Sequence, residues 1–333
     1  MSSDRMKRAA TNLALALANG FILVFFSERL FWTVWRAGDT ISDQVITWLA
    51  YSTAAYLFLS TIVYFRANTV WSVCLAGAGY GWLIEGTLAP TLYGTEGSAP
   101  FPLSLCVTGL SWHMLISVMV GWFGLPRALQ SKRWMPTAGI AAAVGVFWGL
   151  WATFQWHETP PVVTPPAQFF LHAAVITFLL IMACGISLRI GVHNFRPGPV
   201  GLALSTLVLG VFYVQHVTRL GFLPLIVLPA VLSLALMPLW RQRGRQPGVL
   251  AAHVENPPGA PRLGLLLLLP LFATAMYTVA KPLGFEHVPV STIVFYWITA
   301  PIGTALFVVA VVKCWIKRSS GAALPPCSGS SPT

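Results

Sequence analysis

Residues 166–188 read PAQFFLHAAVITFLLIMACGISL, a run of 23 residues that contains no aspartate, glutamate, lysine or arginine. A helix rises 1.5 Å per residue, so about 20 apolar residues span the roughly 30 Å hydrocarbon layer of a bilayer. This run is therefore long enough and apolar enough to cross a membrane as one helix. It predicts an all-helical protein, because helices satisfy their own backbone hydrogen bonds in lipid.

Similar runs lie on both sides of this segment. They share a length near 20 residues and a low content of charge, and they cover approximately residues 9–27, 44–65, 69–92, 102–124, 137–156, 198–217, 220–240, 263–280 and 290–315. Together with 166–188 they predict a polytopic bundle of about ten transmembrane helices. The first run follows basic residues as a signal peptide would, but no small-residue cleavage site follows it, so we expect an anchor.

The composition agrees with this class and excludes others. Of the 333 residues 56% are hydrophobic and only 9% are charged, whereas soluble domains carry about 25% charged residues. Intrinsic disorder needs low hydrophobicity, which is absent here. The net charge of +11 comes from residues scattered between apolar runs, so we expect no nucleic-acid partner and a lipid bilayer as the surrounding partner.

The basic residues predict the orientation. With ten spans and the N-terminus inside, all but four of the 20 lysines and arginines fall in inside segments; the exceptions are Arg29, Arg36, Arg219 and Lys281. This asymmetry follows the positive-inside rule and predicts cytoplasmic N- and C-termini in the plasma (inner) membrane. We expect one transmembrane domain over residues 1–318, with possible halves 9–156 and 166–315, and a disordered cytoplasmic tail over 319–333.

Glu85 is the one acidic residue within a predicted span, in the sequence Tyr80-Gly-Trp-Leu-Ile-Glu85-Gly86. A lone carboxylate in hydrocarbon is costly on every scale. Glu85 is therefore expected to be protonated, paired or exposed to a wet cavity.

Helical spacing suggests a partner for Glu85. On the third span a face of small residues leads to it, comprising Cys74, Ala78 and Gly81; on the fourth span the matching face comprises Cys106, Gly109, His113 and Ser117. Membrane helices approach closely through such faces. The two spans form a hairpin in which Glu85 and His113 lie at similar depth, which predicts a Glu85–His113 pair. The alternative is that each group is satisfied separately by backbone or hydroxyl groups.

Other ionisable residues lie toward the same side of the membrane. They are His172 in the sixth span, His216 at the end of the seventh, and Arg219 after it. Glu85 with His113, His172 and His216 has the donor chemistry of a transition-metal site, and two histidines could hold a haem. No HxxxH or HExxH spacing supports either, so the cofactor stays unknown and no metal is assigned.

The segment from Glu28 to Asp43 is the most polar predicted outer loop. Its apolar residues recur at helical spacing, which favours an amphipathic helix on the membrane surface. The alternative is an acidic loop, with Glu28, Asp39 and Asp43, that binds a metal or a sugar phosphate. Asp39 and Asp43 follow the first span, a position that resembles that of the acids of lipid-linked glycosyltransferases.

Two further resemblances are limited. Phe212-Tyr-Val-Gln-His216 matches the FxxxH fragment of CAAX-type intramembrane proteases, but the EExxxR motif of that family is absent and no function is carried over. The ten-span plan with both termini inside resembles drug/metabolite transporters of the EamA type in architecture alone. No motif of that family can be located residue by residue.

Three functions follow from these features. The first is a transporter or permease for a small solute, with Glu85 as a coupling or binding group; glycine- and proline-interrupted spans favour it. The second is an intramembrane enzyme acting on a lipid or lipid-linked substrate from the outer face, using Glu85 with His113, His172 or His216. The third is a non-catalytic membrane component. The solute, the reaction and the oligomeric state are not determined by the sequence.

Overall fold

The computed structural model describes residues 3–34, 38–95, 99–243, 259–285 and 292–316. Every regular element in these ranges is a helix: α1 (Ser3–Ser27), η1 (Arg29–Phe31), α2 (Ile41–Phe65), α3 (Val70–Thr87), η2 (Pro90–Tyr93), η3 (Leu105–Gly124), α4 (Leu125–Gln130), α5 (Met135–Ala152), η4 (Thr153–His157), α6 (Pro166–Ile190), η5 (Val192–Asn194), α7 (Pro199–Leu220), α8 (Leu223–Gln242), α9 (Ala260–Gly264), η7 (Leu265–Leu267), α10 (Leu268–Ala280) and α11 (Thr292–Ile316). The predicted tail 319–333 lies outside the described residues.

Nine helical segments in the described ranges are long and apolar enough to cross a membrane, which supports an integral membrane protein. The predicted third span, now α3, is not among them. It is rich in glycine and aromatic residues and carries Glu85, and 15 of its 18 residues are buried within the protein. A helix enclosed by other helices needs no lipid-facing apolar surface. The count of ten spans and the orientation of the termini therefore stay predictions.

The helix starts follow local sequence signals. Thr40 caps α2, because its side chain accepts from the backbone N–H of Asp43 while the Asp43 carboxylate accepts from the backbone N–H of Thr40. Thr69 and Ser72 form the same reciprocal cap at α3. Pro166 and Pro199 begin α6 and α7, where a missing backbone N–H costs nothing.

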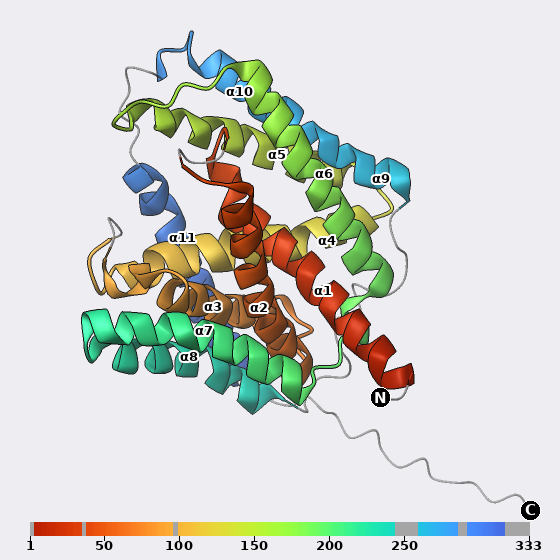
Figure 1. Ribbon diagram of the computed structural model, residues 1–333, viewed down its shortest axis with the longest axis vertical. Coiled ribbons are helices and arrows are strands. Elements are labelled where there is room, and N and C mark those ends of the chain that lie inside the picture. The colour runs from red at the N-terminus through yellow and green to blue at the C-terminus, as the bar shows by residue number, and fades with distance from the viewer. Residues whose placement is uncertain (1–2, 35–37, 96–98, 244–258, 286–291, 317–333) are drawn as a thin grey trace, which may run out of the picture.

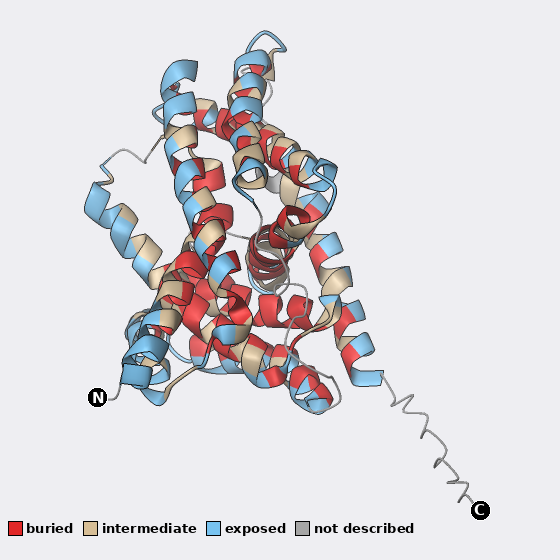
Figure 2. Cartoon of the chain, turned by 90° about the vertical axis from the view of Figure 1, so that its right-hand side faces the viewer, coloured by how far each residue is buried: buried red, intermediate tan, exposed pale blue. Residues whose placement is uncertain are grey.

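The interior consists of two apolar clusters that share α1. Leu23 and Val24 of α1 belong to a cluster with α2, α3, η3 and α8, while Phe25 and Phe26 belong to a second cluster with α5, α6 and α10. In Figure 1, α1 runs between these two groups of helices. Figure 2 shows the buried positions gathered along this interior and the exposed ones on the outer sides of the helices. Because α1 is covered on both faces, its last turn is held inside the bundle.

Many large apolar side chains lie on the outside of the bundle, among them Leu171, Val200 and Trp297. A soluble monomer rarely exposes so much apolar surface, whereas lipid tails cover it at no cost. The described surface is therefore that of a multi-span membrane bundle.

The segment after α1 differs from its prediction. Residues 28–34 contain one short turn, η1, in which Arg29 and Leu30 are buried inside the bundle. Residues 40–43 are exposed where α2 begins, and residues 35–37 lie outside the described part, within which no amphipathic surface helix forms. Gln155 of η4 holds the residues after η1 in place, because its Oε1 accepts from the backbone N–H of Thr33 at 3.0 Å and from its hydroxyl at 2.8 Å. This brings the chain after α1 against the end of α5.

Candidate functional site

Glu85 and His113 form the pair that the helical register predicts. His113 Nε2 of η3 lies 2.5 Å from Glu85 Oε1 of α3. Both residues are buried, with 2% of His113 and 6% of Glu85 exposed. The helices meet here because Gly81 and Gly109 have no side chains, and a Cβ atom on Gly81 would lie only 2.3 Å from the carbonyl oxygen of Gly109. The small faces thus determine which histidine reaches the acid.

A serine extends this pair toward the end of α1. Ser27 Oγ lies 3.1 Å from His113 Nδ1 and 2.8 Å from Ser117 Oγ. When the Nε2 proton is directed at Glu85, Nδ1 accepts the hydroxyl proton of Ser27, and Ser117 can donate to Ser27 in turn. Trp112 fixes the end of α1, since its Nε1–H donates to the Ser27 carbonyl at 3.2 Å. Four polar side chains therefore form one continuous chain from Ser117 to Glu85.

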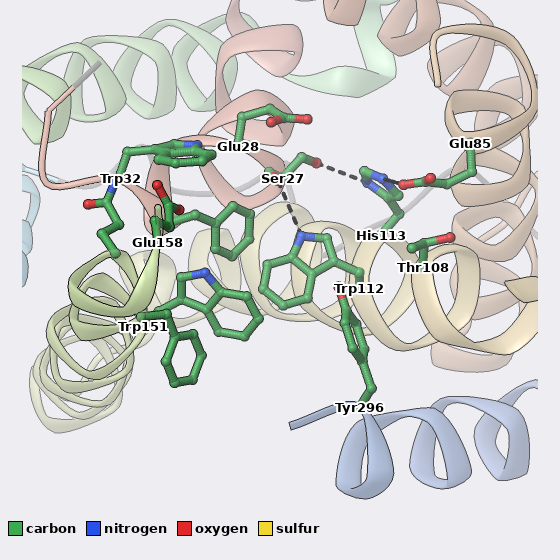
Figure 3. A pocket seen from close by; sticks show the side chains of 13 residues that line it. Ser27, Glu28, Trp32, Glu85, Thr108, Trp112, His113, Trp151, Glu158 and Tyr296 are labelled. Carbon is green, nitrogen blue, oxygen red and sulfur yellow. Dashed lines mark hydrogen bonds and ion pairs between the residues drawn. The ribbon is translucent and has the colours of Figure 1, made fainter. Parts of the chain in front are cut away.

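A cavity of about 300 Å³ opens beside this chain. Its walls come from the ends of α1, α3 and α5, from η1, η3 and η4, and from α11; they comprise Ser27, Glu28, Phe31, Trp32, Glu85, Thr108, Trp112, His113, Trp151, Phe154, Gln155, Glu158 and Tyr296. Figure 3 shows Ser27, His113 and Glu85 in a row along one side, with Trp112 and Trp151 facing the same space. Glu85 thus has both a partner and access to a cavity.

The charged side chains that line the cavity are mainly acidic. Three of its lining residues are carboxylic acids, one is histidine, and none is lysine or arginine. Glu28 accepts a hydrogen bond from the Tyr51 hydroxyl at 2.7 Å, while Glu158 lies at the exposed rim. Such a lining creates a negative potential that attracts positive charge and repels anions.

Six of the thirteen lining residues are aromatic. The rings of Phe31, Trp112 and Trp151 lie together: the Phe31 centroid is 4.0 Å from that of Trp112 and 5.1 Å from that of Trp151, and the two indoles are 5.0 Å apart. Tyr296 of α11 approaches Trp112 with a centroid distance of 6.1 Å. The cavity is therefore an aromatic enclosure with carboxylates at its floor and rim.

The other candidate residues from the sequence lie outside this cavity lining. His216 Nε2 is 2.9 Å from the Thr87 carbonyl oxygen. His172 lies on α6, the helix that packs in the second apolar cluster with α5 and α10. Arg219 is exposed at the end of α7. Asp43 caps α2, and Asp39 accepts from the Gln44 side chain at 2.8 Å.

The four residues whose donor chemistry would suit a metal, Glu85, His113, His172 and His216, do not all come together. Among the described residues no group of three or more histidine, cysteine or acidic side chains could hold a metal ion.

Sequence reasoning overlooked several lining residues, notably Ser27, Trp151, Glu158 and Tyr296. Ser27 and Glu158 stand at predicted span ends, where polar residues are common, and the aromatic residues fit an ordinary interfacial belt. One signal was available: Ser27 and Glu28 directly follow an apolar run, which places them at the outer end of the first predicted span, on the same side as Glu85.

The chain matches no protein-family model, no curated protein and no solved structure.

Proposed function

We propose that this protein is a transporter or permease for a small solute, with Glu85 as its proton-binding coupling group. The observation that supports it is the position of Glu85, which is paired with His113 inside the bundle and also lines a cavity. An ionisable residue at such a place commonly marks a proton or solute pathway. With the N-terminus inside, as the charge asymmetry predicts, the cavity opens to the outer side.

The pair can exchange one proton with the cavity. In the protonated state the pair carries one further proton, on the Glu85 carboxyl or on His113 Nδ1. In the other state the Glu85 carboxylate accepts from the Nε2–H of a neutral imidazole. Binding of solute changes the electrostatic free energy of the two states differently, which links solute occupancy to protonation. Proton release or uptake on binding is the direct consequence.

A row of buried aromatic side chains starts at His113. Tyr80 packs edge-on against His113 with ring centroids 6.0 Å apart, and Phe58 contacts both Tyr80 and Trp122. Trp122 in turn donates to Asn19 Oδ1 at 2.7 Å. Under this proposal these buried side chains close the path from the cavity to the opposite end of the bundle, and transport requires them to part.

Glu85→Gln tests the coupling role, because glutamine keeps the shape and hydrogen-bonding capacity but cannot release a proton. Proteoliposomes loaded with a pH-sensitive dye are given an imposed pH gradient and radiolabelled choline, lysine, alanine, glucose or citrate. We expect gradient-driven accumulation of at least one of these solutes by the wild type, with at least ~10-fold loss in Glu85→Gln. Asp39→Asn, outside the cavity, serves as the matched control. Accumulation undiminished in Glu85→Gln, or none of any solute in the wild type, would refute the proposal.

A second candidate, an intramembrane hydrolase, is favoured by the Ser27–His113–Glu85 chain. Its order is that of nucleophile, general base and orienting acid. In that reaction Ser27 Oγ attacks an ester carbonyl carbon, His113 Nδ1 takes the hydroxyl proton and passes it to the leaving alcohol, and water later releases the acyl group. The transition state places negative charge beside three acidic residues, which disfavours it, so this function ranks second.

Labelling with a fluorophosphonate probe separates the two functions. The probe phosphorylates an activated serine with loss of fluoride, and intact-protein mass spectrometry detects the adduct. If the protein is a permease, Ser27 should carry no adduct under conditions that label a serine hydrolase completely. An adduct that disappears in Ser27→Ala and His113→Ala, but persists in Ser60→Ala, would instead establish the hydrolase.

A further inference from the structure

We infer that the solute recognised in this cavity is a small organic cation with an ammonium group of about the size of choline. The inference rests on the proposed function for the site and adds the chemical class of the solute. It follows from three properties of the cavity: the sign of its charge, the nature of its walls and its volume.

The sign of the charge selects a cation. Glu28, Glu85 and Glu158 line the cavity, and none of its lining residues is lysine or arginine. His113 can offset at most one of these charges, and it is already engaged with Glu85. An anionic solute would enter against this potential, whereas a cation would be concentrated by it.

The walls distinguish an organic cation from a metal ion. A hydrated alkali or alkaline-earth ion needs six or more oxygen ligands arranged around it to replace its water. Six of the thirteen lining residues are aromatic, and no group of three or more histidine, cysteine or acidic side chains among the described residues could hold a metal ion. An alkylated ammonium group is weakly hydrated and is attracted to the faces of aromatic rings, as in aromatic cages for quaternary ammonium. The cluster of Phe31, Trp112 and Trp151 supplies such rings next to the carboxylates.

Hydrogen bonds between the elements that form the cavity hold its carboxylates and its aromatic rings next to each other. The Trp148 indole donates to the Trp32 carbonyl at 3.1 Å, and Gln155 holds Thr33, so the chain after α1 is fixed against α5 and η4. Figure 3 shows Glu28 and Glu158 on the side of Trp32 and Trp151, and Glu85 on the far side of His113. A cation among the rings would therefore have acidic groups on both sides.

The volume limits the size of the solute. A cavity of about 300 Å³ is at the lower end of the usual range for small-molecule sites, which runs to roughly 1,000 Å³. Choline fits this space, while lipids and large drug-like cations exceed it.

The inference is tested by measuring how choline and its neutral isostere 3,3-dimethylbutan-1-ol bind to the purified full-length protein. The two molecules share one shape and differ by the charge on the central atom. We expect choline to bind at least ~10-fold more tightly in equilibrium dialysis, with weaker binding at high salt. Equal binding of the isostere, or no binding of choline or tetramethylammonium, would overturn the inference.

Trp151 variants test the aromatic contribution. Trp151→Leu should weaken choline binding by about tenfold, and Trp151→Phe should retain most of it, because phenylalanine keeps a ring face. Trp134→Leu is the matched control, since Trp134 is 62% exposed and lies outside the cavity lining. Thermal unfolding in detergent checks that each variant is folded. If Trp151→Leu is folded and binds choline like the wild type, the aromatic recognition is wrong.

Different experimental outcomes refute the inference and the proposed function. If choline binds as expected but Glu85→Gln leaves proton-coupled accumulation intact, the solute class holds and the coupling role is wrong. If a neutral or anionic solute is accumulated in a Glu85-dependent way and choline does not bind, the coupling role holds and the solute class is wrong.

Discussion

Replacing Gly81 with alanine should destabilise the protein by about 3 kcal/mol or more, the upper end of the cost of overpacking a close contact. The new Cβ atom would lie 2.3 Å from the Gly109 carbonyl oxygen and 3.0 Å from His113 Cβ. The first of these atoms belongs to the backbone, so a side-chain rotation cannot relieve the overlap and α3 and η3 have to separate. Unfolding by SDS titration in mixed micelles measures the loss.

Gly210→Ala is the matched control for this substitution. Gly210 lies in α7, and no atom would come within 4 Å of an added Cβ. Alanine is the better helix former by about 1 kcal/mol, so stability should be unchanged or slightly raised. Equal effects of the two substitutions would show that the contact between α3 and η3 is looser than the distances indicate.

His113→Ala should cost about 3 kcal/mol. It removes the hydrogen-bond partner of the buried Glu85 carboxyl and one partner of the Ser27 hydroxyl. Removing one member of a buried pair costs about 3–5 kcal/mol, and the lower end applies because Glu85 also lines a cavity that water can enter. Glu85→Gln should cost less, since an amide remains able to hydrogen-bond to the imidazole.

A double-mutant cycle isolates this interaction. Glu85→Ala together with His113→Ala should be more stable than the sum of the single effects predicts, because the second substitution removes the group that the first leaves unpaired. His157→Ala, at an exposed position, should change stability by less than about 0.5 kcal/mol. Strict additivity of Glu85→Ala and His113→Ala would contradict the pair.

The Glu85–His113 pair was accessible to sequence reasoning because it depends on two neighbouring spans. A hairpin fixes the relative depth of its two helices, and small residues such as Gly81 and Gly109 mark the faces that meet. The surface helix expected after α1 was wrong for a related reason. Periodicity identifies an apolar face but not what covers it, and here the bundle covers Leu30 completely.

The contacts of the other histidines could not be predicted in this way. His172 and His216 lie in the outer halves of their predicted spans, as Glu85 does, yet His216 contacts the Thr87 carbonyl and His172 lies on α6. Depth follows from the position of a residue along its helix. Rotation about the helix axis and the choice of neighbouring helices depend on packing across the whole bundle.

The sequence by itself determined that the protein is a helical membrane bundle and that Glu85 needs a partner. The free energy of transferring a segment or a charged group from water into hydrocarbon depends on local composition, which the sequence gives directly. Only the tertiary structure decided that Ser27, Glu28, Trp151 and Tyr296 surround that acid in one cavity. Apart from the consecutive Ser27 and Glu28, these residues are far apart in the chain. They come together because α1 and α11 pack on η3, α11 also packs on α3, and α5 packs on η1 at the end of α1.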